Sequence, residues 1–242
     1  LMYPLSQEGR GGATNYLSRI YETGVGLQKS PFMVRHLNWM GALENDADSM
    51  FRASLDFYQK GHRKDGEHWA VRAKDCGHPE ALIFLIKTYI NDGRSDEARI
   101  LLEQAIDKSL VEAKFILAEQ YDKGGLGLPQ DKNTAFNWYY LAAKDGHASA
   151  MASIAYYFAR GIHGVQDDVA AIEWYHRAAK AGHVESITAY AWMLENGKGA
   201  QKNVEDATYY YKKASRRGDK NAQAFLSELL KNNNRAASAF KA

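Results

Sequence analysis

The chain has 242 residues, of which 45% are hydrophobic and 25% charged, a balance typical of an ordinary folded globular protein. Its 31 basic and 29 acidic side chains leave a net charge of only +2, which gives no reason to expect a nucleic acid as partner. No apolar run approaches the ~20 residues of a transmembrane helix, and a single cysteine, Cys76, excludes an intramolecular disulfide.

The first half of the chain contains weak copies of a helical repeat. The pattern Ala-x3-Leu-x3-Tyr-x2-Gly begins at Ala13 and again at Ala113. Further on, Trp69 is followed eight and nine residues later by a Gly-His pair, as Trp138 is, and Ser109 stands where the third repeat would carry its closing glycine. Because self-similarity at a fixed period is the signature of repeat architectures, these copies predict paired helices from near residue 12 onwards.

The second half contains three copies that keep a step of 36 residues. Each begins with Asp or Asn, which predicts a helix N-cap. Each has an aromatic residue seven positions later, and each closes on a glycine, which predicts the left-handed residue after a helix. The landmarks are Asp131, Trp138 and Gly146, then Asp167, Trp174 and Gly182, then Asn203, Tyr210 and Gly218. We expect the aromatic to fill the space between repeats, so that Trp174→Ala costs ~3–5 kcal/mol.

These patterns predict six two-helix repeats that start near residues 12, 47, 79, 111, 148 and 184, and a capping helix near 220–232. The first repeat and the last three carry glycine-containing loops between their helices, whereas the second and third do not, since Gly61 lies only 8 residues before Trp69. We therefore expect an all-α solenoid over 12–232, with an N-terminal extension at 1–11 and a C-terminal tail at 233–242.

The combined motif, Ala-x3-Leu-x3-Tyr-x2-Gly-x-Gly followed by Asp-x3-Ala-x2-Trp-Tyr-x2-Ala-Ala-x2-Gly, resembles the Sel-1-like repeat of the tetratricopeptide-repeat superfamily. The match is strong over 111–219 and weaker over 12–110, with Tyr210 in place of Trp as one departure. The resemblance implies a bacterial protein with a right-handed superhelix, a concave surface lined by the first helix of each repeat, and adaptor or scaffold work without enzymatic activity or a cofactor. It also implies that such proteins are often exported, and that some are immunity proteins that neutralise secreted toxins.

The surface residues most able to hold a partner lie in the first helices of the last three repeats. If the leading small residue is position one, then positions seven, eight and eleven are expected to fall away from the packing residues. An exposed cluster of aromatic and Met side chains rimmed by charge is typical of a binding hot spot. The alternative is that Tyr156 and Trp192 are large core residues. The candidates are Glu119, Gln120, Lys123, Tyr156, Tyr157, Arg160, Trp192, Met193 and Asn196.

Other candidate chemistry favours a structural interpretation. The repeated His78, His147 and His183 could be metal ligands, but repeat-equivalent positions lie a helix-pair width apart, so a helix-terminus role is favoured. Cys76 lacks an identifiable activating partner. The cations around Lys212 form a cluster that is more often a solvated face. We therefore expect no metal site, no catalytic residue and no cofactor.

Three functions remain open from the sequence. The first is a non-catalytic scaffold that binds another protein through its concave surface. The second is an immunity protein that neutralises a secreted toxin or effector, for example of a type VI secretion system. The third, an enzyme, is disfavoured because no catalytic constellation is present. The first residues, from Leu1, show no signal-peptide pattern, but a removed signal is compatible with this start, and a periplasmic location is favoured over a cytoplasmic one.

Overall fold

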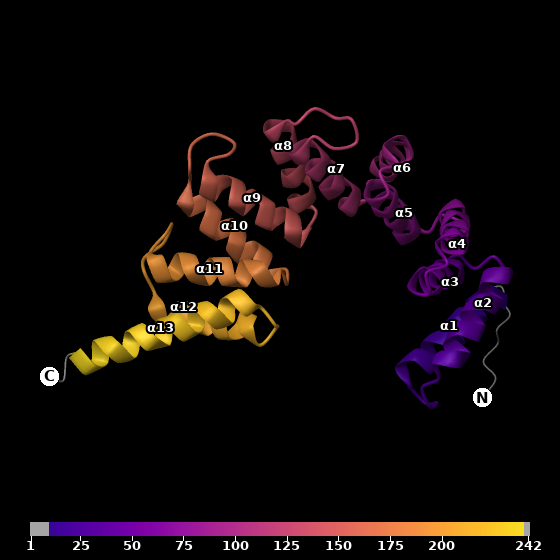
Figure 1. The fold of residues 1–242 in the computed structure, drawn as a ribbon, viewed down its shortest axis with the longest axis horizontal. Helices are drawn as coiled ribbons and strands as arrows, with labels where there is room; N and C mark the ends of the chain where they lie inside the picture. The colour runs from indigo at the N-terminus through magenta and orange to yellow at the C-terminus, as the bar shows by residue number, and fades with distance from the viewer. Residues whose placement is uncertain (1–9, 240–242) are drawn as a thin grey trace. The chain divides into compact units, whose positions relative to one another are not determined.

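The computed structural model describes residues 10–239 and shows thirteen α-helices and no strand within that range (Figure 1). The protein is an all-α solenoid of helical repeats, as the sequence predicts. Most of the predicted N-terminal extension, at 1–9, and the last residues of the predicted tail, at 240–242, lie outside the described residues.

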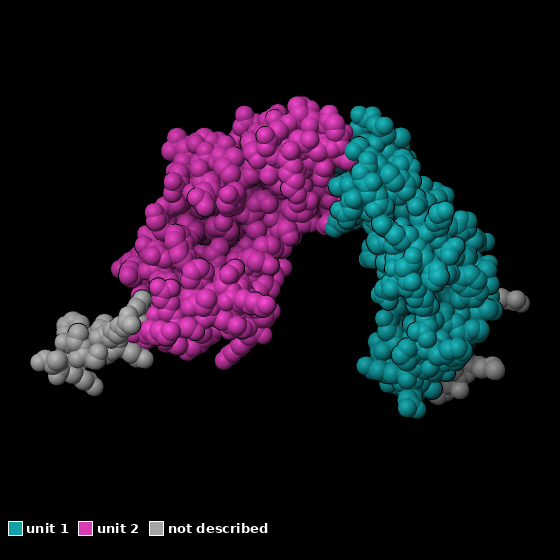
Figure 2. Space-filling view, in the orientation of Figure 1, with its two compact units in different colours: residues 1–110 teal, residues 111–242 magenta. Residues whose placement is uncertain are grey.

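Backbone contacts group the chain into two compact units, at 1–110 and 111–242 (Figure 2). The division falls next to Leu110, which occupies the position of His78, His147 and His183 in other repeats. Unlike a histidine, Leu110 has no side-chain atom that can accept a hydrogen bond from the helix that follows. The first unit contains α1 (Arg10–Thr23), α2 (Pro31–Leu43), α3 (Ala47–Gln59), α4 (Arg63–Asp75), α5 (Pro79–Asn91) and α6 (Ser95–Asp107). The second contains α7 (Val111–Lys123), α8 (Lys132–Lys144), α9 (Ala148–Arg160), α10 (Asp168–Lys180), α11 (Val184–Asn196), α12 (Val204–Ser215) and α13 (Lys220–Ala239).

The predicted starts of the repeats at 47, 79, 111, 148 and 184 coincide with the first residues of α3, α5, α7, α9 and α11. Helix α1 begins at Arg10, close to the predicted start near 12. At the other end, α13 continues to Ala239, beyond the predicted end near 232. The predicted tail is therefore helical as far as Ala239, since 233–239 contains neither Pro nor Gly to stop the helix.

Side-chain caps start the second helix of each of the last three repeats. The Asp131 carboxylate accepts hydrogen bonds from the backbone N–H groups of Asn133 and Thr134, at 2.9 and 3.1 Å. Asp167 and Asn203 accept equivalent bonds from the third residue after them, at 2.9 and 3.0 Å. These bonds satisfy N–H groups that have no partner within the helix. The hydrogen bonds from Thr134 lower the pKa of Asp131, because they favour its charged form.

A left-handed residue ends the second helix of the repeats. Gly146, Gly182 and Gly218 have φ values of 93, 97 and 91°. The Gly146 N–H donates to the Ala143 carbonyl and the His147 N–H donates to the Ala142 carbonyl, at 3.1 and 3.0 Å, which is the Schellman arrangement. The same turn occurs at Ser109, whose φ is +56°, although Ser carries a Cβ that disfavours this conformation.

Substitution at this turn gives a stability test. We expect Ser109→Gly to raise the free energy of unfolding by about 0.5–1 kcal/mol, because glycine removes the steric cost of the left-handed conformation at some cost in chain entropy. The reverse change at the equivalent site, Gly146→Ser, should lower it by a similar amount. Urea denaturation of the two variants measures both effects, and a Ser109→Gly variant that is less stable than the wild-type protein would show that the turn is not strained.

The hydrophobic core of the second unit is built from alanines and from an aromatic residue that differs from the predicted one. Ala142, Ala178 and Ala214, which lie four residues past the predicted aromatic, are fully buried and let the helices approach closely. However, the predicted core aromatics Trp138, Trp174 and Tyr210 are only partly buried. In the first and third of these repeats the buried side chain is the next residue in the chain, and these residues are Tyr139 and Tyr211.

Candidate functional site

A groove runs across the second unit between its first helices α9 and α11 and the capping helix α13. Its volume is about 820 Å³, which lies in the range of ligand-binding pockets. All of its lining residues belong to the second unit. They are Tyr156, Ala159, Arg160, Gln166, Asp168, Tyr175, Glu185, Thr188, Ala189, Trp192, Met193, Lys198, Asp219, Asn221 and Phe225.

Two exposed aromatic side chains from neighbouring repeats line this groove. Tyr156 on α9 and Trp192 on α11 occupy the same position in their repeats, and their side chains are 48% and 42% exposed. The Arg160 guanidinium lies 5.8 Å from the centre of the Tyr156 ring, in cation–π geometry. The structure therefore places these three predicted residues together on one surface, and it shows that neither Tyr156 nor Trp192 is buried in the core.

The expectation that position eight of the first helix is exposed is wrong. Gln120, Tyr157 and Met193 occupy this position and are all buried. Position eight lies seven residues after position one, so that both fall on the same face of a helix with 3.6 residues per turn. The Tyr157 hydroxyl donates a hydrogen bond to Asp122, and burial followed by this bond raises the pKa of Tyr157. Tyr157 thus joins α9 to the preceding repeat, and the buried Met193 also lines the groove.

Three further predicted residues lie outside the lining of this groove. Glu119 and Lys123 form an ion pair with each other along α7, at 3.2 Å between Oε1 and Nζ. Asn196 is exposed, and its side-chain amide donates to the Trp192 carbonyl on the same helix, at 2.8 Å. The candidate site is thus smaller than the predicted one and is centred on α9 and α11.

Two aromatic residues that the repeat pattern did not indicate complete the groove. Tyr175 follows Trp174 on α10, at the position where Tyr139 and Tyr211 are buried, yet in this repeat it lines the groove. Burial raises its pKa. Phe225 comes from α13, and it could have been found only by extending the repeat pattern into the capping helix.

A second hollow of about 430 Å³ continues the same face towards α7. It shares four lining residues with the groove, which are Tyr156, Tyr175, Glu185 and Ala189. Tyr156 therefore lies where the two hollows meet. A surface of this kind, extended over three repeats and containing aromatic side chains at its centre, suits a protein segment better than a compact small molecule.

The charges in the groove are mixed, and most of the carboxylates already have partners. Asp168 lies 3.7 Å from the Lys198 ammonium, and Asp219 accepts a hydrogen bond from the Thr188 hydroxyl at 2.5 Å. Asp219 also caps α13 through the backbone N–H groups that follow it. Arg160 makes no ion pair with the described residues. Arg160 is therefore the charged side chain whose donors are available to a ligand.

The repeated histidines cap the first helix of the next repeat. Nδ1 of His147 accepts from the Ala150 N–H at 3.1 Å, and Nε2 lies 2.7 Å from the Glu112 carboxylate of the preceding repeat. Because Nδ1 accepts a hydrogen bond, the ring proton lies on Nε2, and this N–H donates a hydrogen bond to the Glu112 carboxylate. His78 and His183 cap their helices in the same way, at 3.1 and 3.3 Å. His147 and His78, whose Nε2 atom lies 3.2 Å from Asp48, therefore connect successive repeats, whereas His183 faces Glu185 of the helix that it caps.

We expect His147→Ala to lower the free energy of unfolding by about 1–2 kcal/mol, because it removes a helix cap together with the bond to Glu112. His147→Asn should retain most of the cap, since its side-chain oxygen can accept from the same N–H group. Thermal denaturation compares the two variants. Equal destabilisation by Asn and Ala would contradict the capping role.

Neither a metal cluster nor a membrane span is visible in the part of the chain that the structure describes. No group of three or more His, Cys, Asp or Glu side chains over 10–239 is placed to hold a metal ion. Within the same range, no helix combines the length and the apolar character needed to cross a bilayer. The single cysteine, Cys76, is exposed at the end of α4.

The paired helices, left-handed turns and inter-repeat caps define a helical repeat protein of the solenoid class. Residues 111–147, 148–183 and 184–219 each match the Sel1 repeat family. The second unit thus carries three consecutive Sel1 repeats, and the resemblance stated from the sequence is confirmed there. Sel1 repeats generally act as scaffolds for protein–protein interaction and are typically not enzymes.

Solved structures extend the likeness in fold to the first unit. A Sel1 repeat protein from Oxalobacter formigenes matches 92% of this chain at a TM-score of 0.78 and 20% identity, and the chain covers 66% of that protein. A protective antigen of uropathogenic Escherichia coli strains with an SLR fold matches 91% at 0.64 and 22% identity, with 49% of its own length covered.

An immunity protein from Pseudomonas aeruginosa matches 92% of this chain at a TM-score of 0.53 and 12% identity, and 81% of that protein is covered. At these identities the three likenesses show a shared fold. A comparison with curated protein sequences found no match.

Proposed function

We propose that this protein is a non-catalytic scaffold that holds a partner protein in the groove between α9, α11 and α13. The observation that carries the proposal is the pair of exposed aromatic side chains, Tyr156 and Trp192, at equivalent positions of adjacent repeats. Half-exposed Trp and Tyr side chains leave apolar area in water that a partner would cover. Arg160 beside them completes the Trp, Tyr and Arg composition that dominates binding hot spots.

The mode of binding follows from the geometry. Equivalent residues on stacked helices present the same kind of side chain at the regular spacing of the repeats, so that a partner segment can contact several repeats at once. The aromatic rings would supply most of the affinity, and Arg160 would fix the orientation through a carboxylate or carbonyl oxygen of the partner.

The experiment uses the whole chain as bait in an extract of the cells that produce it. The bound protein is identified by mass spectrometry, purified and titrated against the wild-type chain and against Tyr156→Ala/Trp192→Ala. We expect the double variant to bind at least about 100-fold more weakly, because two hot-spot side chains are worth roughly 2 kcal/mol or more each.

The matched control is Tyr209→Ala. Tyr209 is 60% exposed on α12 and does not line this groove, so its loss should leave the affinity within about twofold. Circular dichroism checks that all variants keep the wild-type melting temperature within a few degrees. A double variant that binds as tightly as the wild-type protein would refute the groove as the binding site.

A second candidate function, that of an immunity protein, is supported by the likeness in fold to the Pseudomonas aeruginosa immunity protein. In this case the partner held in the groove is a secreted toxin. Co-expression with a toxin encoded by a neighbouring gene tests this version. Cells that survive the toxin only when they carry the wild-type chain, and not the Tyr156→Ala/Trp192→Ala variant, would support it, whereas absence of rescue would exclude it for that toxin.

A further inference from the structure

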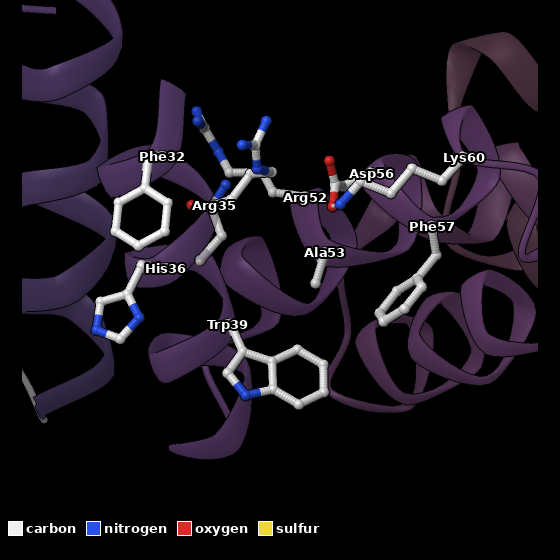
Figure 3. A pocket seen from close by; sticks show the side chains of 10 residues that line it. Phe32, Arg35, His36, Trp39, Arg52, Ala53, Asp56, Phe57 and Lys60 are labelled. Carbon is white, nitrogen blue, oxygen red and sulfur yellow. Dashed lines mark hydrogen bonds and ion pairs between the residues drawn. The ribbon is translucent and has the colours of Figure 1, made fainter. Parts of the chain in front are cut away.

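A second cleft lies in the first unit, between α2 and α3, and was not foreseen from the sequence. Its volume is about 380 Å³ (Figure 3). One wall comes from Phe32, Arg35 and Trp39 on α2, and the facing wall from Arg52 and Phe57 on α3. The floor includes the buried Ala53, whose small side chain leaves room above it.

One side of this cleft is aromatic and open to solvent. The Trp39 ring meets Phe57 edge to face at 6.0 Å between centroids, and it meets Trp69 in the same way at 5.4 Å. Despite these contacts Trp39 is 41% exposed and Phe32 is 68% exposed. Met40 and Leu43, further along α2, are also exposed. A group of large exposed apolar side chains on one helix is typical of an interaction site.

The other side of the cleft is basic. Arg35 makes no ion pair or hydrogen bond with the described residues, and the Arg52 guanidinium bonds only Glu22, at 2.8 Å, through one of its five N–H groups. Figure 3 shows both guanidinium groups on the same side of the cleft. The one carboxylate in the lining, Asp56, is paired with Lys60 at 2.5 Å. The cleft therefore carries excess positive charge beside an aromatic surface.

We propose that the α2–α3 cleft binds a peptide segment of a protein partner in which an Asp or Glu side chain lies next to a bulky apolar one. The carboxylate would receive hydrogen bonds from Arg35 and Arg52, whose planar donors match a carboxylate geometrically. The apolar side chain would cover Trp39 and Phe57. This site belongs to the other unit, and the proposal does not depend on the function proposed for the Tyr156 groove.

The probe is a displayed library of random 12-residue peptides, selected in parallel on the immobilised full-length chain and on its Arg35→Glu variant. We expect the wild-type chain to enrich peptides with Asp or Glu within about three residues of Leu, Phe or Trp, and the variant not to enrich them. A synthetic peptide of the consensus sequence is then titrated by fluorescence anisotropy. Arg35→Glu and Trp39→Ala should each weaken its binding about tenfold or more, as should replacement of its acidic residue by the matching amide.

Two controls keep the test decisive. Arg99→Glu reverses another exposed arginine, on α6, and should leave binding within about twofold. Tyr156→Ala/Trp192→Ala should also bind the peptide normally, which separates this site from the groove. Because Trp39 contacts Trp69, its variant could lose stability, but Arg35 is exposed and its substitution tests the cleft without that complication. The proposal is overturned if no acidic consensus emerges, or if the peptide binds Arg35→Glu as tightly as the wild-type chain.

Discussion

Replacing Tyr211 by alanine is expected to lower the free energy of unfolding by about 3–5 kcal/mol, the range for truncation of a core aromatic. The Tyr211 side chain is fully buried and packs against Phe225 of the capping helix, with ring centroids 5.7 Å apart. Its hydroxyl donates to Glu195 at 2.8 Å, and burial followed by this bond raises the pKa of Tyr211. One side chain thus joins α11, α12 and α13.

Two further variants separate the contribution of the Tyr211 ring to stability from that of its hydroxyl and from that of the neighbouring repeat's Trp174. Tyr211→Phe keeps the ring and removes only the hydrogen bond, so we expect a loss of about 1 kcal/mol. Trp174→Ala should cost less than Tyr211→Ala, because Trp174 packs against the core but is only partly buried, between Tyr140 and the Arg177 guanidinium. Urea denaturation of the three variants measures this order, and a greater loss for Trp174 would reinstate the predicted aromatic as the core residue.

Replacing Gly199 by alanine should lower the free energy of unfolding by about 3 kcal/mol or more, nearly as much as Tyr211→Ala. A Cβ atom at Gly199 would lie 1.9 Å from the Asp168 carbonyl oxygen and 3.0 Å from the Val169 nitrogen, and neither backbone atom can move without disturbing the start of α10. The φ of +72° adds a further penalty for any side chain. The loop between α11 and α12 is therefore held against the preceding repeat by a contact that only glycine permits.

The matched control is Gly127→Ala in the loop between α7 and α8. Gly127 has the same φ of +72°, but a Cβ there would have no atom within 4 Å. Gly127→Ala should therefore lower the free energy of unfolding only by the conformational cost of a positive φ, about 1–2 kcal/mol. Thermal denaturation compares the two variants, and similar losses at both positions would show that the close approach at Gly199 contributes nothing.

The repeat register could be predicted from the sequence because it depends on local chemistry. Asp131 and Gly146 act on backbone groups within a few residues of themselves, so their spacing defines where a helix begins and ends. The same is true of Ser109, which adopts the turn of the glycine it replaces. Helix ends of this kind can be predicted without knowing which helices pack together.

The faces of the helices were harder to predict. Tyr157 was expected on the surface but is buried, because a shift of one residue turns a side chain by about 100° around the helix. Trp174 packs against the core as expected, but it is only partly buried. Two neighbouring aromatic residues, such as Trp174 and Tyr175, make the choice ambiguous from spacing alone. The division into two units depends on packing that no single repeat contains.

The candidate site was partly predictable for the same reason. Tyr156 and Trp192 share a repeat position and could be found by alignment of the repeats. Phe225 could be found only by extending the repeat pattern into α13. The α2–α3 cleft could not be found, because it depends on how the second helix of one repeat packs against the first helix of the next.

Site-specific photo-crosslinking tests whether a partner protein occupies the groove of the second unit. A benzophenone amino acid is placed at position 156 in one variant and at position 209 in another, and each is irradiated with the captured partner. Tyr156 lies in the groove, whereas the exposed Tyr209 does not line it. We expect a covalent adduct with the partner from position 156 and none from position 209. An adduct from position 209 alone would place the partner elsewhere on the solenoid and refute the groove as its binding site.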